Sequence, residues 1–284
     1  MKLAQTRLAI VLAVLVITSS GCGVVNRIRS KNALNEAARA YREGHFEEAE
    51  QYSRRAQALD PDNKTAPQFI ARTIHAQYRP GVQAPENIAK AHQAIEAYQK
   101  ILEKNPKDEE AYKAVAYLYG AIKEDDKLRQ WIASRATSDS VEPEKRAEAY
   151  VVLASKDWDC SYKITEQPTN KVTTIDANNK ATVSYKKPKE QKDFDSAQRC
   201  VKLGLEEIES AIKFNPNNES AWSYKTNLLL EASKLAEMDG KTDLKAEYQK
   251  QSDAALKRTT ELSDANKKKK EQEEAKKSAS PPKT

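Results

Sequence analysis

The stretch from Ala33 to Pro61 constrains the fold more than any other part of the chain, because it carries the marks of two short helices packed together. Small residues stand at Ala37, Ala49 and Ala56, and Gly44 lies midway between the two apolar stretches. Small side chains about a turn apart let two helices approach closely, and glycine can take the left-handed conformation that ends a helix. Because proline cannot continue a helix, the stretch predicts a helical hairpin that ends near Pro61.

The same pattern recurs along the chain. Asn105-Pro106 and Asn215-Pro216 close two later stretches as Asp60-Pro61 closes the first. Apolar residues at helical spacing predict further helices over 68–78, 86–104, 144–162, 193–214, 220–238 and 244–262. The span 109–136 is expected to hold two shorter helices. Aromatic residues make up only 7% of the chain, which favours a solenoid whose units bury their faces on neighbours over one deep core.

These hairpins resemble tetratricopeptide repeats (TPRs), which are helical hairpins of about 34 residues. Trp222 stands where that family often has tryptophan. The resemblance implies an all-α solenoid of about five repeats over residues 33–262 that serves as a protein-binding scaffold. In the family, the first helix of each repeat lines a concave groove, and the family's spacing implies these groove residues: Gln68, Arg72, Lys113, Tyr117, Val151, Ser155, Ser223 and Asn227. The repeated Lys/Asn pattern with which some TPR modules clamp a C-terminal carboxylate is missing, so that activity is not expected here.

An insertion over residues 166–192 interrupts the fourth repeat. Within it, Lys171 to Tyr185 forms two runs rich in Thr, Val and Ile around Asn178-Asn179-Lys180, which indicates a β-hairpin. An isolated hairpin is marginally stable in water, so it should lean on the array or on a partner. Three readings stay open: a hairpin kept for a partner, a hairpin packed only on its own array, and a disordered loop.

Two cysteines flank this insertion, Cys160 near the end of one predicted helix and Cys200 near the start of the next. These two ends meet in an antiparallel hairpin, which brings the pair within disulfide range. The pattern therefore predicts a Cys160–Cys200 disulfide, with two buried free thiols as the alternative.

The N-terminus reads as an export signal. Lys2 and Arg7 precede an apolar run from Leu8 to Ile17, and small residues then lead to Cys22. This arrangement resembles a bacterial lipoprotein signal, although Ser19 stands where that family favours leucine. The resemblance implies a signal peptide over 1–21, acyl chains on Cys22, a linker over 22–32, and a periplasm-facing protein of the bacterial envelope. In that family Asp after the cysteine tends to retain a protein at the inner membrane, so Gly23 weakly favours the outer membrane. An ordinary signal peptide or an uncleaved anchor are the alternatives.

The distribution of charge argues against nucleic-acid binding and sets the tail apart from the folded part. The net charge of +6 comes from the leader and from a Lys-rich tail, and Cys22 to Asn266 carries equal numbers of basic and acidic residues. A nucleic-acid-binding face is therefore not expected on the folded part. The Lys/Glu-rich tail over 263–284 is expected to be disordered.

The residues that catalysis or metal binding requires are missing. The three histidines, His45, His75 and His92, do not pair with Cys or carboxylates at metal-ligand spacing, and nucleophile or phosphate-loop motifs are absent from the sequence. Adjacent acidic pairs such as Glu206-Glu207 are expected on solvated helix faces. We therefore expect no enzyme, no cofactor, no metal and no small-molecule substrate. The expected function is an exported, lipid-anchored scaffold that binds protein partners; the alternatives are a periplasmic spacer without a dedicated ligand and a non-catalytic subunit of an envelope assembly complex.

Overall fold

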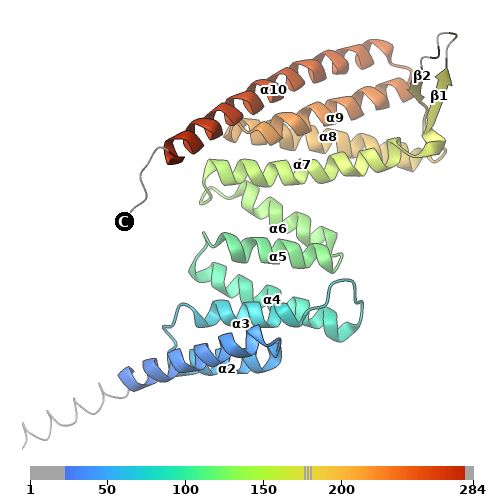
Figure 1. Ribbon diagram of the computed structural model, residues 1–284. Helices are drawn as coiled ribbons and strands as arrows, with labels where there is room; N and C mark the ends of the chain where they lie inside the picture. Colours follow the sequence, from blue (N-terminus) through green and yellow to red (C-terminus); the bar gives the residue numbers. More distant parts are fainter. Residues whose placement is uncertain (1–22, 176, 178, 180, 279–284) are drawn as a thin grey trace, which may run out of the picture. The chain divides into compact units, whose positions relative to one another are not determined.

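The computed structural model describes residues 23–175, 177, 179 and 181–278, and it divides into two compact units, residues 1–128 and 129–284. Both units are built from consecutive α-helices (Figure 1). The stretches for which a signal peptide and a lipidation site at Cys22 were predicted lie outside the described residues, as do the last six residues of the tail.

Unit 1 contains a helix over residues 23–42 and further helices. These are α2 (Phe46–Leu59), α3 (Ala66–Gln77), α4 (Pro85–Lys104), α5 (Glu109–Ala121) and the start of α6 (Asp125–Thr137). In the series from α2 to α5 each helix packs on the next. Their contacts are made largely by alanines whose side chains are fully buried, including Ala37, Ala49, Ala56, Ala66, Ala71 and Ala91. The small residues that predicted close helix contacts therefore lie where the helices meet.

Local chemistry places the helix ends of unit 1. Gly44 has a φ of +80°, so the first turn uses the left-handed conformation that its glycine predicted. Asp108 caps α5 by accepting a hydrogen bond from the Ala111 backbone N–H at 3.0 Å. Proline at the start of α4 fits the first turn of a helix, where its missing N–H has no partner to lose.

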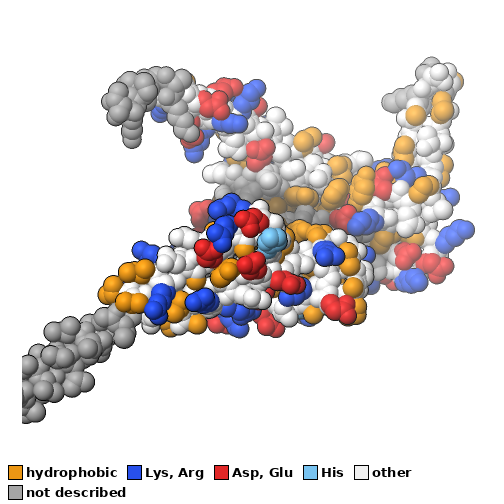
Figure 2. All heavy atoms as spheres, turned by 60° about the horizontal axis from the view of Figure 1, so that its bottom comes forward, with side chains coloured by type: hydrophobic (Ala, Val, Ile, Leu, Met, Phe, Trp, Pro, Cys, Tyr) orange, Lys and Arg blue, Asp and Glu red, His pale blue; other side chains and the backbone are white. Residues whose placement is uncertain are grey.

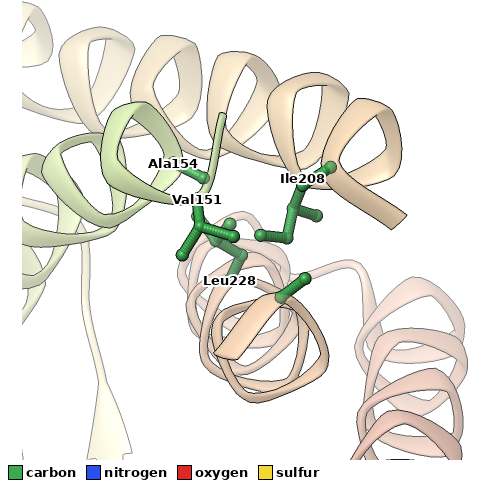
Figure 3. Packing of buried hydrophobic residues seen from close by; sticks show 6 residues of the cluster. Val151, Ala154, Ile208 and Leu228 are labelled. Atoms are coloured by element: carbon green, nitrogen blue, oxygen red, sulfur yellow. The ribbon is translucent and has the colours of Figure 1, made fainter. Parts of the chain in front are cut away.

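Unit 2 contains the rest of α6 and a bundle of longer helices. These are α7 (Pro143–Thr165), α8 (Gln191–Phe214), α9 (Glu219–Met238) and α10 (Thr242–Ser278). Helices α7, α8 and α9 pack on one another, and α10 packs on α9. Figure 3 shows Val151 of α7, Ile208 of α8 and Leu228 of α9 pointing toward one another in the core of this bundle.

A glycine and a disulfide bring α8 close to its neighbours. A Cβ placed on Gly204 would lie 2.6 Å from Cδ2 of Leu228 and 3.2 Å from Cβ of Asp157, so a larger residue at this position would force the Leu228 side chain to move and would crowd Asp157. Cys160 of α7 and Cys200 of α8 form a disulfide with a Cα–Cα distance of 6.1 Å. The predicted pairing is therefore present, and it ties together the two helices that the insertion separates.

The insertion forms the expected β-hairpin between α7 and α8. A 3-10 helix, η1 (Pro168–Asn170), leads into β1 (Lys171–Ile175), which pairs antiparallel with β2 (Ala181–Tyr185). Asn179 in the turn has a φ of +62°, a conformation that asparagine tolerates better than most residues. The register places Thr173 opposite Val183.

The predicted fold class, an all-α array of helical hairpins with a β-hairpin insertion in its fourth repeat, is confirmed. The first helix starts by Gly23, so the segment expected as a linker is helical from that residue on. One element end differs from the expectation. Helix α10 continues to Ser278, whereas disorder was expected from 263; the Lys, Glu, Gln and Ala of this segment are strong helix formers, which the lack of an apolar face does not cancel.

Candidate functional site

An aromatic groove lies on unit 1, where the N-terminal helix, α3, α4 and α5 contribute side chains to two adjoining hollows. We call it the tyrosine groove and define it by Tyr41, Arg72, His75, Tyr98 and Tyr117. Tyr41 is 38% exposed and Tyr117 is 51% exposed, so two large aromatic side chains face solvent here. Exposed tyrosines in a concave surface are typical of sites that bind proteins.

The groove is held together by ring contacts and one ion pair. The His75 ring lies 5.8 Å from the Tyr98 ring and 5.7 Å from the Tyr117 ring, measured between centroids. Arg72 donates to both carboxylate oxygens of Glu110, at 2.6 and 2.7 Å. Because this pair neutralises itself, the groove presents rings and hydroxyl groups more than net charge.

Burial sets the protonation of the groove. It lowers the pKa of His75, which favours the neutral ring at neutral pH. Burial, with the charge of Glu110 nearby, raises the pKa of Tyr98 to about 12. At neutral pH the groove therefore presents a neutral imidazole at His75 and a protonated phenol at Tyr98.

A second hollow, of about 310 Å³, lies on unit 2 beside the β-hairpin. We call it the hairpin hollow; α7, β2, α9 and α10 line it with Trp158, Tyr162, Val183, Tyr185, Asn227, Leu230, Lys234 and Gln249, among others. Three of its apolar side chains are exposed by 41–45%, namely Tyr162, Val183 and Leu230. Apolar side chains from three different elements thus converge on one concave surface.

The floor of the hairpin hollow contains a buried carboxylate. The side chain of Glu231 on α9 is only 1% exposed, and it has partners on both oxygens. Ser161 and Thr165 of α7 donate to Oε2 at 2.9 and 2.7 Å, and Lys234 donates to Oε1 at 2.6 Å. This buried charge is therefore both paired and hydrogen-bonded, which is the condition for tolerating it in an interior.

The same lysine connects the hairpin to the helices through Glu166 at the end of α7. Glu166 accepts hydrogen bonds from Lys234 at 2.6 Å, from Lys171 of β1 at 2.5 Å and from the Tyr185 hydroxyl of β2 at 2.9 Å. Burial by itself raises the pKa of Glu166, but these three donors outweigh it and lower the pKa to about 2. The base of the hairpin is thus fixed to the bundle while Val183 and Ile175, nearer its tip, stay exposed.

The structure separates the eight predicted groove residues. Arg72 and Tyr117 lie together in the tyrosine groove, and Asn227 lines the hairpin hollow. Five remain outside both surfaces: Gln68 and Lys113 are exposed, Ser155 and Ser223 are half-buried, and Val151 is buried. The assignment of Val151 is wrong, because this side chain packs in the core with Ile208 and Leu228; its neighbour Val152 is the exposed one.

Several lining residues were missed by the sequence reading. Leu230 follows the predicted residue Asn227 by three positions, so helical spacing could have suggested it, whereas Trp158 and Tyr162, four positions apart on α7, were not among the predicted residues. No such spacing relates Val183 or Tyr185 to the helices, because strand pairing places them there.

The expectation that Glu206-Glu207 lies on a solvated face is wrong for Glu207. Its side chain is only 15% exposed, and it accepts a hydrogen bond from Arg129 at 2.6 Å. Arg129 also donates to both carboxylate oxygens of Asp157, at 2.9 and 3.0 Å. Two acidic side chains therefore share one guanidinium, and this cluster joins α6, α7 and α8.

No group of His, Cys, Asp and Glu in the part of the chain that the structure describes has an arrangement that could hold a metal ion. Likewise, none of the described helices is long and apolar enough to span a bilayer.

Comparisons with known proteins give a short family match and distant structural likenesses. The model of the protein prenyltransferase alpha subunit repeat matches residues 204–232, in α8 and α9. No curated protein matches the chain. MamA from Desulfovibrio magneticus RS-1 is 14% identical over 84% of this chain and 96% of its own, with a TM-score of 0.35. The solved structure of pilF from Pseudomonas aeruginosa is 14% identical over 78% of this chain and 90% of its own, with a TM-score of 0.34. A tetratricopeptide repeat protein from Parabacteroides merdae is 12% identical over 82% of this chain and 97% of its own, with a TM-score of 0.34. This similarity is too low to assign a function, which is argued below from the surfaces of the chain itself.

Proposed function

We propose that the chain is a non-catalytic scaffold that binds a protein partner in a bacterial envelope, with the hairpin hollow as its main contact surface. The observation that carries the proposal is the convergence of Tyr162, Val183 and Leu230 on one concave surface. Aromatic and aliphatic side chains in such a hollow are the usual centre of a protein interface, and the polar residues around them fit its rim.

The fixed base of the hairpin supports the same proposal. A hairpin that only filled space would bury its apolar face on the bundle, yet Val183 is 45% exposed and Ile175 is 68% exposed. Because Lys171 and Tyr185 hold the strands in place, a partner would meet a preformed surface and would lose less conformational entropy on binding. The tyrosine groove gives the scaffold a second recognition surface on unit 1, where an extended peptide could lie over the rings of Tyr41 and Tyr117.

A pair of matched variants tests the hairpin hollow. Leu230→Asp is expected to remove a reproducible partner recovered by affinity purification from gently solubilised envelopes, because a charge at the centre of an apolar contact weakens it by more than about 2 kcal/mol. Leu203→Asp on α8 is the control, since Leu203 and Leu230 are both 44% exposed and only Leu230 lines the hollow. Quantitative mass spectrometry of the captured proteins gives the readout.

The outcomes separate the candidate functions. A partner lost with both variants would point to unspecific damage, and one kept with both would move the contact to the tyrosine groove, where Tyr117→Ala is the next variant. If the unmodified chain captures no partner, the spacer reading is favoured over a scaffold. A point substitution is preferable to deleting the hairpin, because deletion would also remove Lys171 and Tyr185 from the ion-pair network.

The proposal includes export and lipid anchoring at Cys22, which rest on the leader sequence alone. Cells fed a radiolabelled or alkynyl fatty acid are expected to incorporate the label into the unmodified chain and not into Cys22→Ser. Several acyl chains would give stable membrane attachment, since about two such signals are needed. Label that persists in Cys22→Ser, or a chain that takes up none, would contradict the anchor and leave the binding surfaces unaffected.

A further inference from the structure

The N-terminal helix of unit 1 carries an exposed apolar stripe in its first two turns. Val24 is 60% exposed, Val25 is 45% exposed and Ile28 is 55% exposed. Three large aliphatic side chains so close in sequence are seldom all left in water without a reason. Figure 2 shows hydrophobic side chains gathered at this end of the described chain, with Lys and Arg side chains nearby.

The opposite face of the same helix is fixed to the array. Ser30 is fully buried and donates to the Ala56 carbonyl oxygen at 2.8 Å, and Ala33 and Ala37 continue this buried face. With about 100° per residue, the buried face is centred near the direction of Ser30, and Val24, Val25 and Ile28 point to the far side. The packing of unit 1 therefore sets which way the stripe faces.

Basic residues flank the stripe on both sides. On the same helical wheel, Arg27 and Lys31 lie along one edge of the stripe and Arg29 lies along the other. All three are exposed, and residues 23–35 contain no acidic residue. An apolar strip bordered by cations is the pattern of a helix that lies in the interface of an anionic bilayer.

We propose that the first two turns of this helix lie on an anionic lipid surface, with Val24, Val25 and Ile28 in the boundary between headgroups and acyl chains and with Arg27, Arg29 and Lys31 on lipid phosphates. A bilayer fits better than a protein partner because the stripe is short, lacks aromatic residues and has cations on both flanks, whereas the centres of protein interfaces are depleted in charge. The contact orients unit 1 relative to the membrane, a role that neither recognition surface covers.

The inference does not depend on an acyl chain at Cys22, although such a chain would start one residue before this helix. With it, the stripe would act as a second membrane signal beside the lipid. Without it, binding would be weaker and would depend more steeply on the three cations, each of which changes partition onto an anionic surface by about fivefold.

The test measures the depth of position 28 in a bilayer. The full chain carrying Ile28→Trp is purified in detergent and reconstituted into vesicles of phosphatidylglycerol and phosphatidylcholine with brominated acyl chains, which quench tryptophan fluorescence on contact. The native tryptophans, Trp131, Trp158 and Trp222, all lie in unit 2, and the unmodified chain gives their background. Glu47→Trp, at an exposed position of α2, is the matched control in unit 1.

Excess quenching is expected for Ile28→Trp, none for Glu47→Trp, and the excess should disappear when Arg27, Arg29 and Lys31 are all replaced by glutamine. A chain that carries acyl label but shows no excess quenching at position 28 would overturn this inference alone. If Val25→Asp instead converts a dimer to a monomer in analytical ultracentrifugation, the stripe is an interface between two copies and the membrane assignment is wrong.

Discussion

Replacing Lys234 by methionine is expected to lower the free energy of unfolding of unit 2 by about 3–5 kcal/mol, because it leaves the buried Glu231 carboxylate without a counter-charge. Ser161 and Thr165 would still donate to Glu231, but hydroxyl groups do not balance a full charge in a side chain that is 1% exposed. Glu166 would lose one of its three donors at the same time, which loosens the base of the hairpin. Urea unfolding followed by far-UV circular dichroism measures the loss.

A second substitution separates charge from packing. Glu231→Gln in the Lys234→Met background removes the unpaired charge while keeping an acceptor for the two hydroxyl groups, so it should recover a large part of the stability. Lys245→Met is the control, since Lys245 pairs with the more exposed Glu237 at 2.9 Å and an ion pair of that kind contributes about 1 kcal/mol or less. If Lys234→Met and Lys245→Met cost the same, the buried carboxylate is not what makes Lys234 important.

The repeat pattern predicted most of the architecture because the same few signals act locally. Alanine positions, Gly44 and the closing prolines each determine a contact or an end within one hairpin, so their effects do not depend on distant parts of the chain. The end of α10 shows where this local reading fails. The last turns of α10 consist of helix-forming residues without an apolar face. Disorder was predicted because the segment has almost no apolar residues to bury, whereas its helix propensity favours a helix.

The recognition surfaces were only partly predictable, for a different reason. Of the residues that family spacing suggested, Arg72, Tyr117 and Asn227 line one of the two hollows, and each stands on the first helix of its repeat. Family spacing failed at Val151, since the long α7 packs on both α8 and α9 and so buries a face that an ordinary repeat leaves open. The residues that the insertion adds to the hairpin hollow are placed by the pairing of β1 with β2 and by the hydrogen bond from Tyr185 to Glu166. These contacts join residues far apart in the sequence, so the spacing of residues along one helix cannot predict them.

Buried charge was the other feature that local reading misjudged. Glu207 and Asp157 belong to different helices and come together only when α7 packs on α8, where Gly204 allows the close approach. Adjacent acidic residues on a helix point apart, so the pair Glu206-Glu207 gave no sign that one member is buried. Gly204, one turn before Glu207, was the sequence feature that could have indicated burial here, because a glycine within a helix often marks a close contact with another helix.

The cluster of Arg129, Asp157 and Glu207 makes stability depend on pH. Burial and the neighbouring Asp157 raise the pKa of Glu207 to about 8, although Arg129 opposes the shift. The folded chain therefore keeps a proton that the unfolded chain has already lost between about pH 4.5 and pH 8. Stability contributed by this group falls as pH rises through that window and does not change further above it.

Replacing Arg129 by leucine is therefore expected to destabilise unit 2 by up to about 3–5 kcal/mol near pH 8.5, because Glu207 must then either stay charged without a counter-charge or bind a proton from a solution in which protons are scarce. At pH 5 the loss should be clearly smaller, because Glu207 is protonated and can donate a hydrogen bond to Asp157. Urea unfolding at the two pH values, with the unmodified chain measured in parallel, gives the comparison.

Glu207→Gln supplies the control for this second prediction, because glutamine resembles the protonated acid and does not titrate. It should flatten the fall in stability of the unmodified chain between pH 5 and pH 8.5, and it should restore part of what Arg129→Leu loses at the higher pH. Equal losses for Arg129→Leu at both pH values would show that Arg129 acts through the packing of its side chain. A pH dependence that persists in Glu207→Gln would assign the titration to another group.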